Sequence, residues 1–479
     1  MAKKKKKKKN FIGPLILILL LILAVLLVVL IFTTLKEPKK ESGTSSPSET
    51  ALPEEEPEIF TGLAGISAEK QASILEYGTY GVWLQWNGSF PKEEGKTVDS
   101  LSLCWQKETG TEETFLPVTT QTLHFSEEED DVHFCISEDI NNGVFLDRLD
   151  LPDGAYSLLL RVRYAGEEEG DAGEEEVLSF SDSSGLSPVE YYTMTKNGKN
   201  RRIRILPAEH EGTPYFSFTV EEAELPEDVY DIVLDPGHGG KDLGAVNGSV
   251  FERDLALQVA EDLKADLESE GYKVFMTRDG TESDEVNFAR TMYDPDGRVN
   301  TSCASKGKVL FCIHYNSFKE DTSVGGVEIY CSSKADTHFA ELLANDVTED
   351  AGTHFSTKEQ CKVAPGVYVR TFTEAEIAQE EADAENVGLE SYPRDTDTDY
   401  YFMLREYGER WTGAYVDGRG EKYGANEFRN ENAGLESILL ELGYISNEAD
   451  LKNIMTNREG YVSGILRAFH EWLGEDDAA

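Results

Sequence analysis

Residues 232–240, Ile-Val-Leu-Asp-Pro-Gly-His-Gly-Gly, decide the fold of the second half of the chain. The apolar start of this stretch predicts a short strand buried on both faces, and Pro236 ends it. The three glycines can adopt backbone conformations closed to other residues, so the chain can turn sharply around His238. The stretch therefore predicts an imidazole held at a strand end, a position suited to binding a metal ion. A glycine-rich turn with an incidental histidine is the alternative that this motif alone leaves open.

Helical and strand patterns alternate downstream of this motif. Residues 254–270 carry apolar residues with helical spacing. Further buried strands are expected at 272–277, 308–313, 326–330 and 437–442. The alternation predicts an α/β domain over residues 228–475, with a central, mostly parallel sheet flanked by helices. Sites in such sheets form beyond the carboxyl ends of the strands, where His238 and His314 are both expected.

Glu252 is a third candidate ligand, because it lies just ahead of the predicted helix, where the helix N-terminus favours a carboxylate. Two neutral imidazoles and one carboxylate form the ligand set of catalytic zinc sites that keep a fourth position open for water. A zinc ion held by His238, Glu252 and His314 would remain a strong Lewis acid. The three residues together predict a zinc hydrolase.

Glu441 is an unusual residue, since it lies within the apolar run of residues 438–442. A carboxylate in a buried strand costs several kcal/mol unless a charge or a metal compensates it. One interpretation is a catalytic group that moves protons at the zinc site. The alternative is a buried ion pair, for which Arg290, Arg298 and Arg405 are candidate partners.

The first 60 residues differ from the rest of the chain in composition. Seven consecutive lysines predict a basic cytoplasmic tail over residues 1–10, and the following apolar run predicts a transmembrane signal anchor over residues 11–33. Residues 34–60 are rich in Pro, Ser, Thr and Glu and predict a disordered linker. The expected localisation is a single-pass membrane protein with a cytoplasmic N-terminus and an extracytoplasmic catalytic domain.

Residues 61–222 show short strand patterns separated by turn signals. They predict a β-sandwich domain, for which an immunoglobulin-like arrangement is one possibility. The region contains no catalytic constellation, and a regulatory protein or a wall ligand is a possible partner for it. Cys104 and Cys135, in two of its strands, are candidates for a disulfide. The formal charge of the whole chain is −46, which argues against nucleic acid as a partner.

Six ordered motifs in the α/β region resemble those of a known family. They are residues 233–240 with Gly244-Ala245, then 252–254, 274–278, 313–317, 326–330 and 440–447. In order and spacing they resemble the zinc-dependent N-acetylmuramoyl-L-alanine amidases, type 3, of bacterial cell walls, over roughly residues 228–473. Two departures are Ser302-Cys303, where the family usually has Ala-Asn, and a longer stretch at 356–432. That stretch is either a lid or regulatory insertion or a plain surface excursion.

The resemblance implies a function and a role for each site residue. His238, Glu252 and His314 would be the zinc ligands, and Glu441 the catalytic acid and base. The implied substrate is peptidoglycan, cut at the amide between N-acetylmuramic acid and L-alanine of the stem peptide. The first hypothesis is therefore a membrane-anchored zinc amidase on the cell-wall side of the membrane. The alternatives are a zinc carboxypeptidase or other amide hydrolase of the wall, and a degenerate, non-catalytic scaffold that binds the wall.

Overall fold

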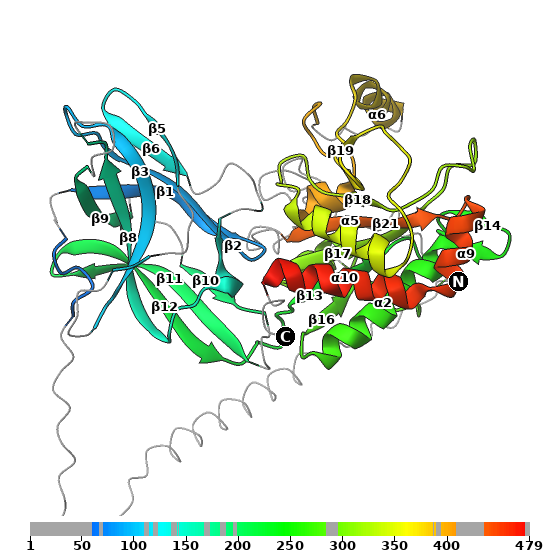
Figure 1. The fold of residues 1–479 in the computed structure, drawn as a ribbon, viewed down its shortest axis with the longest axis horizontal. Coiled ribbons are helices and arrows are strands. Elements are labelled where there is room, and N and C mark those ends of the chain that lie inside the picture. Colours follow the sequence, from blue (N-terminus) through cyan, green and yellow to red (C-terminus); the bar gives the residue numbers. More distant parts are fainter. Residues whose placement is uncertain are drawn as a thin grey trace, which may run out of the picture. The chain divides into compact units, whose positions relative to one another are not determined.

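The structure, a computed structural model, describes most of residues 60–474. The internal residues outside the description are 67–69, 110–114, 118–122, 136–140, 142, 167–172, 183–187, 195–198, 284–295, 387, 389–393 and 409–434. The described part contains an all-β region followed by an α/β region (Figure 1).

The all-β region contains twelve described strands, whose pairing links them into one sheet. The strands are β1 (Gln71–Tyr80), β2 (Trp83–Pro91), β3 (Val98–Lys107), β4 (Phe115–Pro117), β5 (His124–Glu127), β6 (Asp131–Cys135), β7 (Val144–Phe145), β8 (Gly154–Tyr164), β9 (Glu175–Asp182), β10 (Val189–Tyr192), β11 (Asn200–His210) and β12 (Thr213–Ala223). Most neighbours are antiparallel, but β1 and β9 are parallel. The prediction of an all-β region is therefore correct, and the sandwich arrangement expected for it stays a prediction.

The α/β region is built on a seven-stranded sheet in the order β16-β13-β17-β21-β18-β20-β19. Its strands are β13 (Ile232–Pro236), β16 (Val274–Met276), β17 (Val309–Asn316), β18 (Glu328–Tyr330), β19 (Lys362–Ala364), β20 (Val367–Tyr368) and β21 (Glu436–Tyr444). The β18–β21 and β19–β20 pairs are antiparallel, and the other pairs are parallel. The sheet is mixed, which corrects the mostly parallel sheet expected from the alternating pattern. Part of the 356–432 stretch, β19 and β20, forms the edge of this sheet.

Alternating side chains give the sheet two different faces. In β17, Phe311 and Ile313 contribute to the larger core, while Leu310 and Cys312 contribute to the smaller one. Helices α2 (Glu252–Ser269), α5 (His338–Asp350) and α10 (Arg458–Leu473) cover the larger core (Figure 1). The short helix α4 (Arg298–Ala304) and the π-helical turn η2 (Met403–Gly408) contribute to the smaller core. His314 follows Cys312 by two residues, so alternation directs its side chain to the face of the smaller core.

Three remaining elements complete the α/β region. A hairpin of β14 (Val246–Asn247) and β15 (Val250–Phe251) precedes α2, and α9 (Glu448–Thr456) lies between β21 and α10. Helix α6 (Glu374–Asn386) has no buried residue. Its composition explains this, because six of its thirteen residues are acidic and Ile377 is its one large apolar residue, so it offers no apolar stripe to a core.

The predicted membrane anchor has to be corrected. Residues 11–33 lie outside the described residues, as do the predicted tail and linker around them. Within the described part of the chain, no helix has both the length and the apolar composition needed to cross a membrane. The predicted N-terminal transmembrane helix is therefore not supported, and neither is the single-pass localisation that depended on it.

The predicted disulfide is also absent. None of the six cysteines, Cys104 and Cys135 included, forms a disulfide in the structure. Cys104 is buried in β3, where its thiol lies 3.8 Å from the Leu159 carbonyl oxygen. It is a small core residue rather than half of a crosslink.

The all-β region packs against the end of the α/β sheet where its central parallel strands begin. Val82, Phe145 and Met194 belong to the same apolar cluster as the α/β core. Trp83 packs against Phe145 and Trp472, with ring centroids 4.6 and 6.3 Å apart. His314 lies toward the opposite end of its strand. The all-β region therefore abuts the sheet at the end away from His314.

A buried carboxylate lies at this junction. Glu436, the first residue of β21, accepts hydrogen bonds of 3.1 Å from Trp83 Nε1 and from Asn141 Nδ2. Burial raises the pKa of Glu436 to about 8, although these two hydrogen bonds oppose the rise. Between pH values of about 4.5 and 8, the Glu436 carboxyl is therefore ionised in the unfolded chain but protonated in the folded chain. Glu436 makes folding less favourable as the pH rises through this window.

Glu436→Gln is expected to weaken the pH dependence of stability. Glutamine resembles the protonated carboxyl, so the variant avoids the cost of burying the charge, about 1.4 kcal/mol for each unit by which the native pKa is raised. Urea unfolding at pH 5 and pH 9 measures the free energy of unfolding of both proteins. The wild type should lose more of it between the two pH values than the variant. The same change at the exposed Glu459 is the control. Equal losses in wild type and Glu436→Gln would contradict the prediction.

Candidate metal centre and active site

Three predicted ligands meet at one point. His238 Nε2 lies 3.0 Å from Glu252 Oε2, and His314 Nδ1 lies 2.9 Å from Glu252 Oε1. One ligand atom from each residue lies within 4.8 Å of the others. The residues come from the turn after β13, the first position of α2 and β17, so the fold assembles the group from separate elements.

Backbone donors fix the Glu252 carboxylate. Oε2 accepts a 2.7 Å hydrogen bond from Ala245 N, and Oε1 accepts one of 3.0 Å from Tyr315 N. Each oxygen thus has one backbone partner and faces one imidazole. Burial alone would raise the pKa of Glu252, but the two imidazoles hold it well below its ordinary value. The carboxylate is therefore charged and oriented.

The turn that carries His238 is held by side chains on both sides. His238 has a positive φ of 61°, which is unusual for a residue with a side chain. Its Nδ1 lies 2.9 Å from Asp242 Oδ2, which leaves Nε2 to face Glu252. Two buried arginines hold the backbone of the same turn: Arg278 donates to the Pro236 and Gly237 carbonyls, and Arg298 donates to the His238 carbonyl. Asp242 and the arginines thus orient a ligand without touching the point of convergence.

Two glycines give the ligand rings their space. A Cβ atom on Gly237 would lie 2.4 Å from the His314 ring, and one on Gly244 would lie 2.5 Å from both Glu252 Oε2 and His238 Cδ2. Side chains at these positions would displace the ligand atoms. The donor set, two imidazoles and one anchored carboxylate, matches that of catalytic zinc sites. The residues present therefore fit a zinc ion.

Glu441 lies beside these residues on the same face of the sheet. It is the register partner of His314 across the β17–β21 pair and of Glu328 across the β18–β21 pair. Its Oε2 is buried and has no hydrogen-bond partner among the described residues. Burial, with the nearby carboxylates of Glu252 and Glu328, raises the pKa of Glu441 well above its ordinary value. These features suit a group that exchanges a proton with a bound substrate or water.

The ion pair considered as an alternative for Glu441 does not form with the arginines described. Arg298 pairs instead with Asp235, at 3.3 Å, and Arg405 donates to the carbonyls of Asp399 and Tyr400. Arg290, the third candidate, lies outside the described residues. Neither described arginine therefore accounts for the carboxylate in this strand.

Sequence reasoning missed the residues that support the site. Asp242, Arg278 and Arg298 contact the His238 turn. Arg278 is part of the 274–278 motif and Arg298 was considered as a partner for Glu441, but the sequence assigned neither of them this supporting role. Glu328 could have been recognised from the sequence, because it is a carboxylate within the apolar stretch 326–330. Glu441 was singled out for the same kind of position. Glu328 is fully buried, with Tyr330, Ser356, Tyr444, Asn316 and Lys358 as hydrogen-bond donors.

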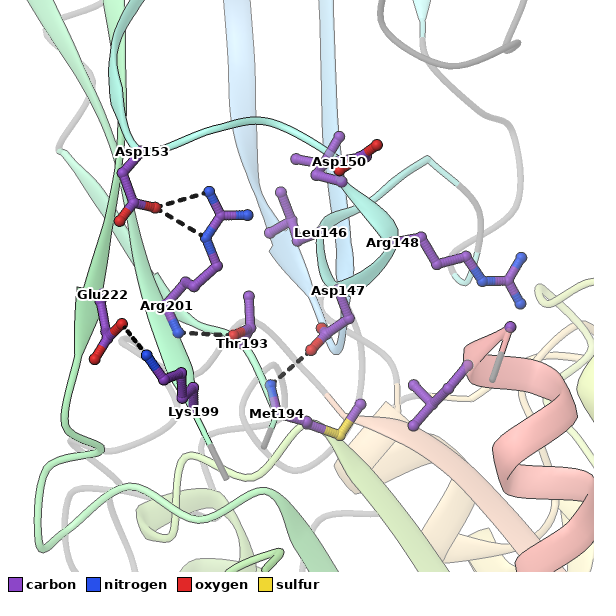
Figure 2. Close-up of a pocket in the computed structure, with 13 residues that line it drawn as sticks. Leu146, Asp147, Arg148, Asp150, Asp153, Thr193, Met194, Lys199, Arg201 and Glu222 are labelled. Carbon is purple, nitrogen blue, oxygen red and sulfur yellow. Dashed lines mark hydrogen bonds and ion pairs between the residues drawn. The ribbon is translucent and has the colours of Figure 1, made fainter. Parts of the chain in front are cut away.

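A separate cavity of about 610 Å³ lies between the all-β region and the end of α10 (Figure 2). Four of its charged residues form two ion pairs: Arg201 lies 3.0 Å from Asp153, and Lys199 lies 2.7 Å from Glu222. None of the four candidate site residues lines it. The cavity therefore belongs to the junction and not to the candidate metal centre.

Comparisons with known proteins find similarity to N-acetylmuramoyl-L-alanine amidases over part of the chain. Residues 232–381 match the family model described as N-acetylmuramoyl-L-alanine amidase. An uncharacterized protein of Bacillus subtilis, YqiI, is 28% identical over 36% of this chain and 81% of its own length. The germination-specific N-acetylmuramoyl-L-alanine amidase of the same organism is 29% identical over 29% of this chain and 60% of its own length. The solved structure of the amidase AmiC2 of Nostoc punctiforme is 20% identical, covering 52% of this chain and 98% of that chain with a TM-score of 0.32.

Proposed function

Because residues 232–381 match the family model of N-acetylmuramoyl-L-alanine amidases, we propose that this protein is a zinc-dependent hydrolase of peptidoglycan. The bond cleaved is the amide between N-acetylmuramic acid and L-alanine of the stem peptide. The convergence of His238, Glu252 and His314, with Glu441 on the neighbouring strand, is the observation that carries the proposal. A scaffold that only binds the wall would need none of these four groups.

The three converging residues would hold the zinc ion. When bound, zinc supplies Lewis acidity, which acidifies water toward neutrality and polarises the substrate carbonyl. Glu252 contributes the one negative charge of the ligand set, and its backbone hydrogen bonds keep both oxygens in place. Asp242 keeps Nε2 of His238 turned toward the centre.

Glu441 would move the proton. In amide hydrolysis a water molecule attacks the carbonyl carbon, the C–N bond breaks, and the leaving amine takes up a proton. Glu441 accepts the proton from the attacking water and transfers it to the nitrogen of L-alanine. Its register position beside His314 and its unpartnered oxygen support this role.

Product analysis tests the proposed bond. Purified cell wall, digested with the zinc-loaded protein, should gain new N-terminal alanine, and a chelator should stop the reaction until zinc is restored. Release of free D-amino acids instead would support the carboxypeptidase alternative. Intact wall in the presence of one zinc ion per protein molecule would support the non-catalytic scaffold and contradict the proposed function.

A further inference from the structure

The all-β region and the α/β region share one apolar core. Val82, Phe145 and Met194 come from three segments of the all-β region, yet all three are buried in the cluster that forms the α/β core. The ring of Phe145 lies 5.0 Å from that of Trp472, near the end of α10. Glu58–Ala479 accordingly form one compact unit. Moving the regions apart would expose these apolar side chains to water, which the hydrophobic effect opposes.

The turn between β1 and β2 lies directly against the start of two central strands of the α/β sheet. A Cβ atom on Gly81 would lie 2.9 Å from Glu436 N and 2.9 Å from the Lys308 carbonyl oxygen, so a larger residue would push the turn away. Lys308 precedes β17 and Glu436 begins β21. These strands carry His314 and Glu441. The all-β region therefore contacts the backbone on which the candidate site is built.

Asn141 joins the two regions through hydrogen bonds. Its Nδ2 donates to Glu436 Oε1 at 3.1 Å and to the Asp336 carbonyl oxygen at 3.2 Å. Its Oδ1 accepts a 2.7 Å hydrogen bond from Asp336 N, just ahead of α5. Trp83 Nε1 donates to the other oxygen of Glu436. Because Asn141 is buried, these directional contacts hold the junction in register and are not exchanged for water while it stays closed.

We infer that the all-β and α/β regions unfold as one cooperative unit, so that the all-β region is a structural part of the unit that carries the candidate metal centre. Domains of one chain move relative to one another by default, unless their interface is large and apolar. Here the core continues from one region into the other, and the β1–β2 turn contacts the strand starts.

This coupling gives the all-β region an influence on the site without any direct contact with it. A ligand that binds only the folded form of the all-β region stabilises the whole cooperative unit, including the strands that carry His314 and Glu441. The inference does not depend on which bond the protein cleaves, and it goes beyond the proposed function for that reason.

Amide hydrogen exchange in the full chain tests the inference with two conservative variants. Ile205→Val removes one buried carbon from β11 in the all-β region, and Ile465→Val removes one from α10 in the α/β region. Such a change should raise the exchange rates of the slowest amides about threefold to tenfold, because these amides exchange through global unfolding. In one cooperative unit, the slowest amides of β8 and of β17 respond by the same factor in each variant.

Val363→Ala is the control, because it also shortens an aliphatic side chain but at a position that is 55% exposed. Exchange in both regions should stay within about twofold of the wild type. A rise confined to the region that carries the substitution, in either isoleucine variant, would overturn the inference. That result would leave the proposed function standing, since the measurement uses no cleavage. Conversely, a protein that cleaves no amide in cell wall but shows the shared response would contradict only the proposed function.

Discussion

Glu441→Gln should lower the rate of amide cleavage by about a thousandfold or more while the protein keeps its zinc. Proton transfer by a positioned side chain typically contributes between a hundredfold and ten-thousandfold. Glutamine has nearly the same shape but cannot accept a proton from water. Since Glu441 is not one of the three converging ligands, metal content should remain at one ion per molecule. Initial rates on a synthetic muramoyl peptide and elemental analysis of the same sample measure both quantities.

Glu436→Gln is the matched control for this experiment. Glu436 is a buried glutamate on the same strand as Glu441, but it contacts Trp83 and Asn141 at the other end of the strand. Its variant should cleave the peptide at close to the wild-type rate. A Glu441→Gln protein that loses both zinc and activity would show that Glu441 supports the metal. One that remains active would show that another group transfers the proton.

The α/β core could be predicted from sequence because its strands and first helix are strongly patterned. The strand expected at 232–234 is β13, and the helix expected at 254–270 is α2, which begins two residues earlier at Glu252. The strand expected to stop before His314 continues to Asn316, because its backbone keeps pairing with β21. Local sequence patterns located these elements, but hydrogen bonding between strands that are distant in the sequence set their ends.

The all-β region was less predictable for the same reason. Strand β1 pairs with β9, for example Gln71 with Ser179, across more than a hundred residues. Alternating apolar residues identify a strand but not its neighbour. They cannot distinguish two stacked sheets from one continuous network. The antiparallel pair of β18 and β21 was missed similarly, since apolar runs buried on both faces look alike in either direction.

Residues of the candidate site could be predicted where a polar residue lies within or directly after an apolar strand. His238 after a buried strand and Glu441 inside one were both visible in the sequence. Arg298 was named only as a partner for Glu441, and it holds the backbone of the His238 turn instead. Lys358 lies in a segment without a regular pattern, so only the folded chain shows that it reaches Glu328. Supporting residues depend on tertiary contacts, which periodicity does not report.

Glu252→Gln should weaken zinc binding strongly, although glutamine has nearly the same shape as glutamate. Both oxygens of Glu252 face donors: Oε2 faces Ala245 N, and Oε1 faces Tyr315 N. A glutamine amide has one oxygen, so its NH₂ group must point at one of these backbone N–H groups. The mismatch leaves a buried donor without an acceptor, at a cost of about 1–3 kcal/mol, and the ligand set loses its single negative charge.

The expected result is at least a hundredfold weaker zinc binding in competition with a chelator, and loss of peptide cleavage. The unfolding midpoint of the metal-free protein should also fall, because the unmatched donor is present without zinc. Asp254→Asn is the matched control, since Asp254 lies in the first turn of the same helix with a side chain 51% exposed. Retained zinc affinity in Glu252→Gln would remove Glu252 from the ligand set. A fall in affinity without any loss of metal-free stability would show that only the charge of Glu252, and not its hydrogen bonding to Ala245 and Tyr315, matters to the site.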